Sequence, residues 1–327
     1  MTAVTVRVPA KVNLQLAVGP VRPDGFHELV TVFHAISLYD EVTVSEAGRR
    51  RVTVTGEGAA AVPDGDDNLA VQAVTALARA AGLPPRRVPR VVSGSSGSPA
   101  ASAGPGVAIE IRKRIPVAAG LAGGSADAAA ALVACNELWR AGLSQQELAE
   151  VAAGIGSDVA FALVGGTSVG QGRGERLTPA LVTGQYHWVL AFAADGLSTA
   201  DVYRACDRIR AARDIVAAPP RLSNELMSAL RSGDPAEVGP LLGNELQPAA
   251  VSLRPELRRT LAVGREYGAL GAIVSGSGPT CAFLVADAHR AVDLVVALTG
   301  AGVCRSAVRA VGPAQGAVMV SPSEMMD

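Results

Sequence analysis

The chain has 327 residues, with 29 lysines and arginines against 30 aspartates and glutamates, and a formal net charge of -1. A chain of this length exceeds the size at which a single hydrophobic core remains efficient, so we expect two packed domains with a cleft between them. The balanced charge provides no basic surface for nucleic acid or an anionic membrane, and the expected partners are therefore small molecules.

The cysteines and the N-terminal segment indicate a cytoplasmic protein. The four cysteines form no CxxC pair and have no matching histidine cluster, so neither a zinc site nor a disulfide framework is expected. They are Cys135, Cys206, Cys281 and Cys304. Residues 1 to 9 alternate like a strand and lack the charged region and apolar run of a signal peptide. The most apolar stretch, about residues 115 to 135, is interrupted by glycines and polar residues, which is not typical of a membrane span.

The N-terminal part of the chain predicts a sheet followed by one helix. Strand-like apolar patterns occupy residues 4 to 18, 29 to 38, 41 to 46 and 51 to 55. Asp67 and Asn68 can cap a helix over residues 69 to 81, which ends at Gly82 before two prolines. Residues 84 to 106 have too little bulky apolar surface to offset the entropy of ordering, so we expect a mobile surface loop there.

The rest of the chain alternates between strands and helices. Strands are predicted over residues 107 to 112, 187 to 193, 271 to 275, 281 to 286 and 306 to 312. Helices are predicted over residues 125 to 140, 144 to 153, 158 to 163, 199 to 213, 223 to 231, 255 to 267 and 288 to 299. This mixture predicts an α+β protein with an N-terminal domain over residues 1 to 182 and a C-terminal domain over residues 183 to 327.

A glycine-rich segment lies between the strand predicted over residues 107 to 112 and the following helix. Free backbone N–H groups and the helix dipole at such a turn can hold a polyphosphate, so this segment is a candidate phosphate loop. The residues expected to contact ATP are Pro116, Val117, Ala118, Ala119, Gly120, Leu121, Ala122, Gly123, Gly124, Ser125 and Ala126. Ser125 can cap the helix or turn its hydroxyl toward Mg²⁺ or phosphate, and Asp127 either complements the dipole or contributes to metal binding.

The specificity of this loop is limited. It contains no GxxxxGK[ST] pattern and no GxGxxG fingerprint, and the chain has neither the HRD nor the DFG triplet of protein kinases. By itself the loop predicts only a nucleotide-using protein.

Five segments turn this pattern into a family resemblance. The string from Pro116 to Asp127 is similar to the second motif of the galactokinase, homoserine kinase, mevalonate kinase and phosphomevalonate kinase superfamily. Pro9 to Leu14 and Asp24 to Leu29 resemble the N-terminal signatures of the branch that phosphorylates a cytidine-diphosphate-linked methylerythritol in non-mevalonate isoprenoid synthesis. Gly156 to Phe161 and Gly276 to Thr280 extend the resemblance toward the C-terminus.

The resemblance implies a fold and a pair of substrates. The N-terminal domain would be of the ribosomal-protein-S5 type and the C-terminal domain ferredoxin-like. ATP with Mg²⁺ and an alcohol substrate would meet in the cleft between these two domains.

Three polar residues are candidates for the chemistry. Lys11 and Asn13 lie two apart on a predicted strand, so their side chains face the same side. Taken alone, Lys11 is equally well explained as an edge-strand lysine, and Asp158 as a carboxylate that caps a helix. The resemblance implies that Lys11 stabilises the transferring phosphoryl group, that Asp158 accepts the proton of the attacking hydroxyl, and that Asn13 binds the substrate.

The resemblance also implies a site for the cytosine. Phe26 stands where tyrosine is commoner, so it keeps a stacking ring and lacks a phenol hydrogen bond. His27 would bind the edge of the base and Tyr203 would supply the opposite ring, whereas lone aromatic and histidine residues are more often structural. Gly276 and Ser277, in a third glycine-rich loop, would form a second wall of the active site.

Three other functions stay open. Gly166 to Gly170 satisfies the GxSxG pattern of serine hydrolases around Ser168, but a nucleophile elbow should open a helix, and another glycine-rich stretch follows here. A kinase of the same superfamily that acts on homoserine, mevalonate or a sugar would share the ATP loop. A non-catalytic nucleotide-binding regulator would have no need of Lys11 and Asp158.

Overall fold

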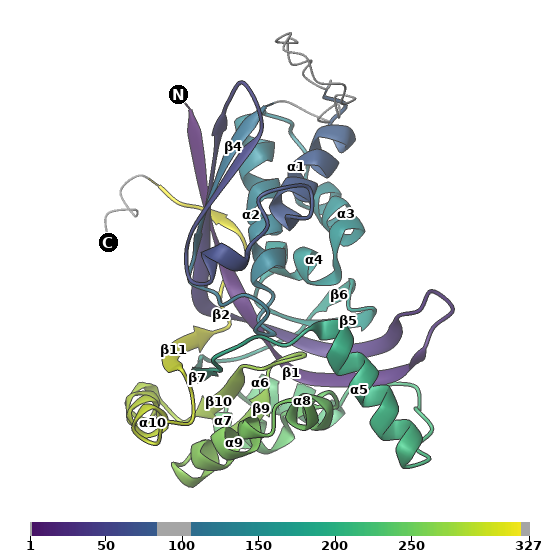
Figure 1. Cartoon of the computed structure of the whole chain (residues 1–327), viewed down its shortest axis with the longest axis vertical. Helices are drawn as coiled ribbons and strands as arrows, with labels where there is room; N and C mark the ends of the chain where they lie inside the picture. The colour runs from purple at the N-terminus through teal and green to yellow at the C-terminus, as the bar shows by residue number, and fades with distance from the viewer. Residues whose placement is uncertain (1, 84–105, 322–327) are drawn as a thin grey trace.

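The structure, a computed structural model, describes residues 2–83 and 106–321. It consists of two β-sheets with helices packed on each, one sheet above the other in Figure 1. The loop expected over residues 84 to 106 lies outside the described residues except for its last position. None of the helices in the described ranges is long and apolar enough to cross a membrane.

The first sheet has eight strands among the described residues. They are β1 (Ala3–Val21), β2 (His27–Glu46), β3 (Arg51–Gly56), β4 (Val107–Lys113), β5 (Thr167–Gly172), β6 (Arg176–Pro179), β8 (Gly243–Asn244) and β12 (Val318–Met319). The order is β12-β1-β2-β4-β3, with β5 on β2, β6 on β5 and β8 on β1. β1 and β2 form one long antiparallel hairpin, and its three register shifts bend it along its length.

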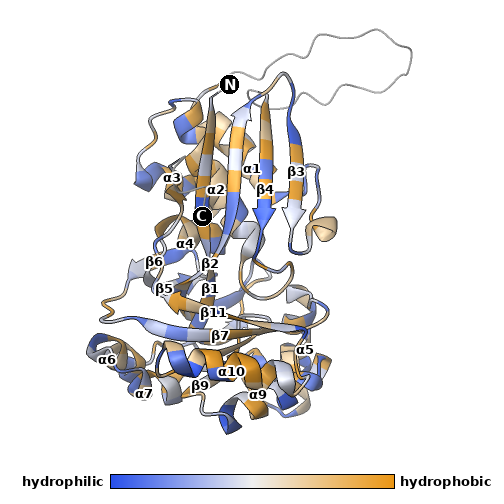
Figure 2. Ribbon diagram, turned by 90° about the vertical axis from the view of Figure 1, so that its left-hand side faces the viewer, coloured by the Kyte–Doolittle hydropathy of each residue, from blue (hydrophilic) through white to orange (hydrophobic). Residues whose placement is uncertain are grey.

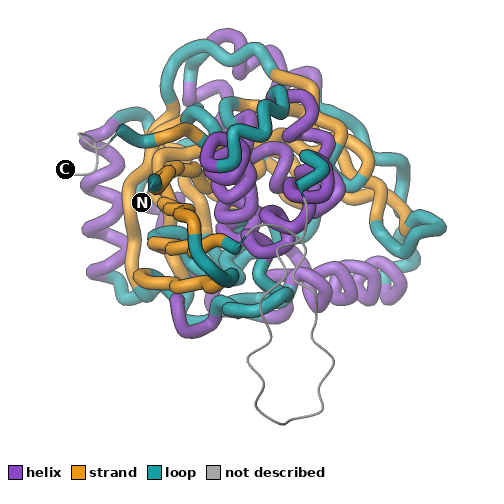
Figure 3. The backbone as a smooth tube through the Cα atoms, turned by 90° about the horizontal axis from the view of Figure 1, so that it is seen from above, coloured by secondary structure: helices purple, strands orange, loops and turns teal. Residues whose placement is uncertain are grey.

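Four helices cover one face of the first sheet and lie together beside its strands (Figures 1 and 3). They are α1 (Leu69–Ala80), α2 (Gly123–Leu138), α3 (Gln145–Ile155) and α4 (Ser157–Val164). The predicted cap of α1 is confirmed, because the side chain of Asn68 accepts a hydrogen bond from the Ala70 N–H at 2.9 Å. The run from Ala128 to Ala131 in α2 is fully buried, and these small side chains let α2 approach the sheet closely.

The second sheet has the strand order β11-β7-β10-β9, with every pair antiparallel. Its strands are β7 (Tyr186–Phe192), β9 (Gly271–Val274), β10 (Cys281–Val285) and β11 (Ser306–Gly312). The accompanying helices are α5 (Thr199–Ala212), α6 (Asn224–Ser232), α7 (Pro235–Val238), α8 (Gln247–Leu253), α9 (Glu256–Glu266) and α10 (Ala288–Gly300). Numbered along the chain, the strand order is 4-1-3-2, which is the ferredoxin-like arrangement. The expected α+β fold with two sheets is confirmed.

The two sheets share a hydrophobic core along β7. Trp188 and Leu190 belong to the core that also contains the strands and helices of the first sheet, whereas Val189 and Ala191 belong to the core under α9 and α10. This alternation follows from the two-residue period of a strand. Burial of such large apolar side chains stabilises the fold by roughly 1.5–3 kcal/mol each, and Figure 2 shows the apolar residues along both layers.

The structure corrects several predicted boundaries. The two strands predicted over residues 29 to 38 and 41 to 46 are one continuous strand, β2. The polar break between them is Asp40, which is fully buried and bound to Lys113, so the carboxylate does not interrupt the strand. The short elements β6, β8, β12, α7 and α8 were not predicted. The domain boundary near residue 182 stays a prediction, and β8 and β12 return from the later part of the chain to the first sheet.

Candidate active site

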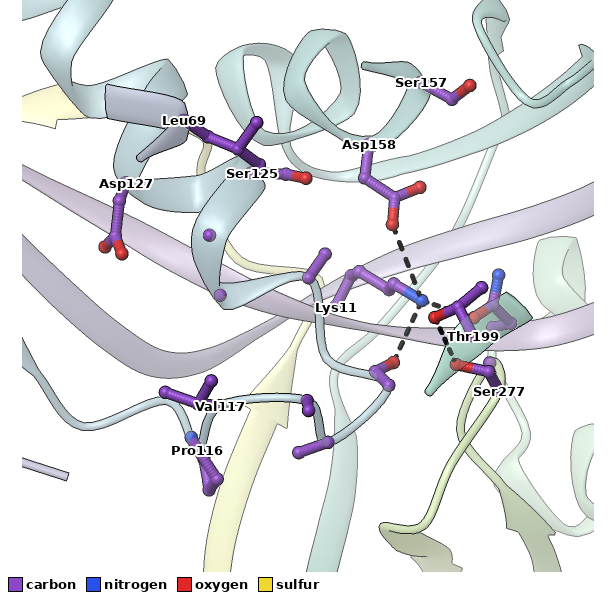
Figure 4. Close-up of a pocket in the computed structure, with 18 of the residues that line it drawn as sticks. Lys11, Leu69, Pro116, Val117, Ser125, Asp127, Ser157, Asp158, Thr199 and Ser277 are labelled. Atoms are coloured by element: carbon purple, nitrogen blue, oxygen red, sulfur yellow. Dashed lines mark hydrogen bonds and ion pairs between the residues drawn. The ribbon is translucent and has the colours of Figure 1, made fainter. Parts of the chain in front are cut away.

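A cavity of about 530 Å³ lies where the two layers meet. Its lining comes from β1 and β2, the glycine-rich loop before α2, the first turns of α4 and α5, and the loop between β9 and β10. Figure 4 shows residues of these segments around the side chain of Lys11. The first and last lining residues along the chain are Lys11 and Ser277, so segments more than 250 residues apart in sequence contribute to one site.

The glycine-rich loop is held between β1 and the loop after β9. The backbone N–H of Lys11 donates to the carbonyl of Leu121 at 3.3 Å, and the hydroxyl of Ser275 donates to the carbonyl of Gly120 at 3.1 Å. Gly120 has a φ of +77°, and a Cβ at this position would lie 2.0 Å from the carbonyl oxygen of Ser275. Only glycine fits this conformation and this approach, so the two loops form one continuous wall.

Two of the helices that begin at the cavity, α2 and α4, lack side-chain caps. α2 follows Ala122, which has a left-handed φ of 61°, and α4 follows Gly156. Neither start has a capping side chain, although the starts of α1, α3, α5, α6 and α10 all do. Uncapped N termini leave backbone N–H groups and a partial positive charge directed at the cavity, which suits an anionic ligand.

Ser125 therefore does not cap α2. The alternative prediction of a capping role is wrong because α2 begins two residues earlier, at Gly123. The side chain of Ser125 lines the cavity and makes no hydrogen bond to another side chain in residues 2–83 and 106–321. Its hydroxyl is free to meet a ligand, and it points away from the helix in Figure 4.

The remaining loop residues divide between the cavity and the core. Those that line the cavity are Pro116, Val117, Ala118, Ala119, Gly120, Ala122, Gly123, Gly124 and Ser125. Leu121 and Ala126 are each 1% exposed and belong to the hydrophobic core. Their side chains anchor the loop and do not reach the cavity.

Lys11 is the centre of a polar cluster at the base of the cavity. Its ammonium group donates to Asn13 Oδ1 at 2.7 Å and to the carbonyl of Gly120 at 3.0 Å, and it lies 4.0 Å from a carboxylate oxygen of Asp158. Asn13 is itself fixed, because its amide donates to Thr31 Oγ1 at 2.8 Å. Burial lowers the pKa of Lys11, and the charge of Asp158 opposes this shift. Lys11 and Asn13 point to the same side of β1, as their spacing predicted.

Gly276 and Ser277 close the cavity from the second layer. A Cβ at Gly276 would lie 3.0 Å from the Lys11 ammonium nitrogen, so the backbone of this loop packs directly on the lysine. The carbonyl oxygen of Gly276 accepts a hydrogen bond from the side-chain amide of Asn244 at 2.7 Å. Ser277 shares a hydrogen bond with Thr199, the first residue of α5, at 2.9 Å. The loop is thereby tied to both layers.

The three residues expected to bind cytosine lie at the rim. Tyr203 lines the cavity, and its ring centroid is 4.9 Å from that of His27, whose Nε2 is 2.9 Å from Asp207 Oδ1. Phe26 is 54% exposed and contacts Arg173, which lines the cavity. Among the described residues, Phe26 and His27 do not themselves line the cavity, but each contacts a residue that does.

Asp127 lines the cavity and also belongs to a buried group of ionisable side chains, while its part in metal binding stays a prediction. It is 3% exposed, and its Oδ2 accepts a hydrogen bond from Lys113 at 2.7 Å, while Lys113 also donates to Asp40 at 2.5 Å. Burial and the neighbouring charge of Asp40 raise the pKa of Asp127 to about 7, against the opposing effect of Lys113. This buried group of three charges joins α2 to β2 and β4 behind the phosphate loop.

Sequence reasoning missed several residues that line the cavity, and three of them bear on its chemistry. They are Lys113, Arg173 and Thr199. Thr199 follows the capping Ser198, which marks the start of a helix but does not show what that start faces. Arg173 stands between Gly172 and Gly174, which mark a tight turn but do not show what the turn faces.

The serine hydrolase alternative has no structural support. Ser168 lies inside β5 and is 1% exposed, and the chain continues from β5 into a hairpin with β6. A nucleophile elbow instead places its serine at a sharp turn from a strand into a helix.

Comparisons with known proteins assign this fold and site to a family. A family model described as GHMP kinases N terminal domain matches residues 68–166, and one described as GHMP kinases C terminal matches residues 226–304. The 4-diphosphocytidyl-2-C-methyl-D-erythritol kinase of Mycolicibacterium gilvum is 53% identical over 98% of this chain and 94% of its own length. The enzyme of the same name from Thermobifida fusca is 52% identical over 98% of this chain and 99% of its own.

A solved structure gives the same result at the level of the fold. A crystal structure of 4-(cytidine 5'-diphospho)-2C-methyl-D-erythritol kinase matches with a TM-score of 0.71 and 32% sequence identity, covering 94% of this chain and 98% of that one. The two relatives and the solved structure match nearly the whole length, and the family models match two segments within it. The chain therefore belongs to the GHMP kinase family, within its group of 4-diphosphocytidyl-2-C-methyl-D-erythritol kinases.

Proposed function

We propose that the enzyme transfers the γ-phosphoryl group of ATP to the 2-hydroxyl of 4-diphosphocytidyl-2-C-methyl-D-erythritol, giving the 2-phosphate and ADP in non-mevalonate isoprenoid synthesis. The observation that carries this proposal is the pair of Lys11 and Asp158, whose charged atoms lie 4.0 Å apart in the same cavity as the uncapped N terminus of α2. Phosphoryl transfer needs little more than positioning, charge stabilisation and a proton acceptor.

Each group has a role in the proposed reaction. The loop from Pro116 to Ser125 and the N-terminal N–H groups of α2 hold the phosphates of ATP. Asp158, 33% exposed at its side chain, accepts the proton of the attacking hydroxyl. Lys11 stabilises the negative charge on the transferring group, and its three contacts fix it in place before the substrates arrive.

The described residues fit a Mg²⁺ ion that is carried by ATP. They contain no group of three or more His, Cys, Asp or Glu side chains arranged to hold a metal. Lys113 binds Oδ2 of Asp127, whereas its Oδ1 has no hydrogen-bond partner, so Oδ1 of Asp127 and the hydroxyl of Ser125 are oxygens at the start of α2 that could ligate an ion. Mg²⁺ bound mainly by phosphate oxygens and water needs few protein ligands, and when bound it neutralises charge on the phosphates.

The cytidine end of the acceptor would lie at the rim that Tyr203, His27 and Phe26 form. Tyr203 offers a ring at the cavity wall, and Asp207 fixes His27 at 2.9 Å for a hydrogen bond to a base edge. A kinase acting on homoserine or mevalonate would have no use for this rim.

A panel of alcohols with Mg-ATP tests the proposal. We expect ADP release to accelerate strongly with 4-diphosphocytidyl-2-C-methyl-D-erythritol and to stay at background with homoserine and mevalonate. Phosphorus NMR of the product should show a new monoester on the 2-hydroxyl. Good turnover of another alcohol without turnover of the cytidylyl compound would refute the proposed acceptor.

A further inference from the structure

Three cationic side chains line the cavity among the described residues, and they differ in how far their charge is already compensated. Lys113 is bound by Asp40 and Asp127 at 2.5 and 2.7 Å. Lys11 lies 4.0 Å from Asp158. The guanidinium of Arg173 makes no salt bridge within 4.0 Å in residues 2–83 and 106–321, although its charge acts on Asp24 from a greater distance, so its charge is the least compensated of the three.

The position of Arg173 assigns it to one side of the cavity. It lies in the turn between β5 and β6, where its backbone N–H donates to the carboxylate of Glu175 at 2.6 Å. A Cβ on the next residue, Gly174, would lie 3.6 Å from the Cβ of Ser157 and 3.4 Å from the ring of Phe33. The turn therefore packs beside the start of α4, which carries Asp158, and so on the side where the acceptor hydroxyl must approach.

Phe26 supports the guanidinium from outside the cavity. The guanidinium carbon of Arg173 lies 5.0 Å from the centroid of the Phe26 ring, a cation–π contact. Stacking uses the face of the guanidinium and leaves its N–H donors available around the edge. Asp24, the nearby acidic residue, is already paired with Arg22 at 3.2 Å.

We propose that Arg173 binds the diphosphate bridge of the cytidylyl acceptor, with Phe26 as the platform that orients its guanidinium. The proposal rests on the proposed function, because it takes the acceptor to be a cytidine diphosphate ester. A planar guanidinium with free edge donors matches the paired oxygens of a diphosphate, and each such charge-assisted bond is directional. Arg173 would then select acceptors that carry a diphosphate over simple alcohols, and Phe26 would act on the acceptor partly through Arg173.

Binding measurements with CDP and cytidine separate the diphosphate from the base. Isothermal titration would use the full chain with a non-hydrolysable ATP analogue present, so that the phosphate loop is occupied. Arg173→Ala should weaken CDP binding by roughly 10- to 100-fold, the effect of losing one or two charge-assisted hydrogen bonds, and should change cytidine binding far less. Arg173→Lys should restore part of the CDP affinity because it keeps the charge.

Arg176→Ala is the matched control. Arg176 belongs to the same hairpin, its side chain is 66% exposed, and it lies 3.8 Å from Glu28 outside the cavity lining. This variant should bind CDP like the wild type. With the cytidylyl acceptor and ATP, Arg173→Ala should raise the acceptor KM and leave the KM for ATP unchanged.

The outcomes separate this inference from the proposed function. Equal losses of CDP and cytidine binding in Arg173→Ala, or no loss of either, would overturn the role of Arg173. The proposed function would still stand if the wild-type enzyme turned over the cytidylyl acceptor. A wild-type enzyme that neither binds CDP nor turns over the acceptor would overturn both. A thermal midpoint of Arg173→Ala equal to that of the wild type would exclude misfolding as the cause of its loss, and partial CDP affinity in Arg173→Lys would support the charge as the cause.

Discussion

Lys11 occupies a gap in the edge of the first sheet. β12 pairs with β1 at Val6 and Arg7, and β8 pairs with β1 at Gln15 and Leu16. Between these two short partners the backbone N–H of Lys11 is free to bond to the phosphate loop. The interrupted edge thus allows the loop to join the sheet directly beside the lysine.

Asp158 gives the sharpest residue-scale prediction. Replacement by asparagine keeps the shape and removes the proposed proton acceptor, so Asp158→Asn should lower kcat by roughly a hundredfold or more. Affinity for nucleotide should survive, because the uncapped start of α2 and the loop before it are unchanged. Steady-state kinetics and titration with an ATP analogue measure the two effects. Near-normal turnover in this variant would show that another group accepts the proton.

His27 gives a prediction about the base. The ring is held by Asp207 at 2.9 Å and packs at 4.9 Å on Tyr203, which lines the cavity. His27→Ala should therefore raise the KM for the cytidylyl acceptor far more than the KM for ATP. His289→Ala is a suitable control because that side chain is 85% exposed on α10. Equal increases in both KM values would argue against a role at the cytosine.

The residue-scale predictions from sequence depended on local spacing. Lys11 and Asn13 were identifiable because alternate residues of a strand share a face. Arg173 and Thr199 were not, because their place in the cavity depends on how a hairpin and a helix start pack against α4 and the loop after β9. Such contacts between distant segments leave no periodic pattern in a single sequence.

At the scale of elements, α2 is fastened to the sheet by charge as well as by apolar packing. Asp40 accepts from Lys113 and from the backbone N–H groups of Arg114 and Ile115, at 2.6 and 2.9 Å for the latter two. Asp127 binds the same ammonium from α2. These bonds to Asp40 fix the position of the backbone where β4 ends and the segment that leads to the phosphate loop begins.

Lys113→Met should be strongly destabilising. The substitution keeps the volume of the side chain but leaves two buried carboxylates without their cation, and breaking a buried pair costs about 3–5 kcal/mol. Arg112→Met on the same strand is the control, because that side chain is 62% exposed and its pair with Glu41 contributes at most about 1 kcal/mol. Urea denaturation at pH 8 compares the two. Similar midpoints for both variants would contradict a structural role for the buried charges.

Long, patterned elements of this chain were predictable and short ones were not. β1, α1, β7 and α10 carry a clear period or a capping residue at their starts. β8 and β12 have two residues each and exist because β1 offers them an unpaired edge. Their formation depends on the assembled sheet, which the local sequence does not encode.

At the scale of the whole molecule, the two layers meet around a neutral histidine. His34 of β2 is completely buried, with its Nδ1 at 2.7 Å from Thr167 Oγ1 and its ring 5.7 Å from that of Tyr186. A Cβ at Gly312 of β11 would lie 2.3 Å from its Nε2, so the second sheet packs directly on the ring. Burial lowers the pKa of His34 from 6.5 to about 3.

His34 and Asp127 should affect the pH dependence of stability in opposite directions. The unfolded chain takes up a proton at His34 near pH 6.5 and the folded chain does not until about 3, so stability is lost as pH falls through this window. Asp127, with its folded pKa raised from 3.8 to about 7, holds a proton that the unfolded chain releases, so its contribution is lost as pH rises.

Two variants test this opposition. Between pH 4.5 and 6.5, a group that binds one proton more in one state than in the other changes the free energy of unfolding by about 1.4 kcal/mol per pH unit. His34→Asn should make unfolding less sensitive to acid than in the wild type, and Asp127→Asn should make it more sensitive. Urea unfolding at several pH values gives both slopes. Parallel profiles for all three proteins would show that neither group changes its protonation on folding.

The returning strands β8 and β12 also set an order of events during synthesis. β2, the first partner of β1, follows it directly in the chain, but the partners for the second edge of β1 are at residues 243–244 and 318–319. The nascent chain can form the hairpin of β1 and β2 as soon as both strands are made, and the other edge of β1 stays without its strand partners until β8 and β12 have been translated. The strand that carries Lys11 is thus paired along one edge long before its other edge can be completed.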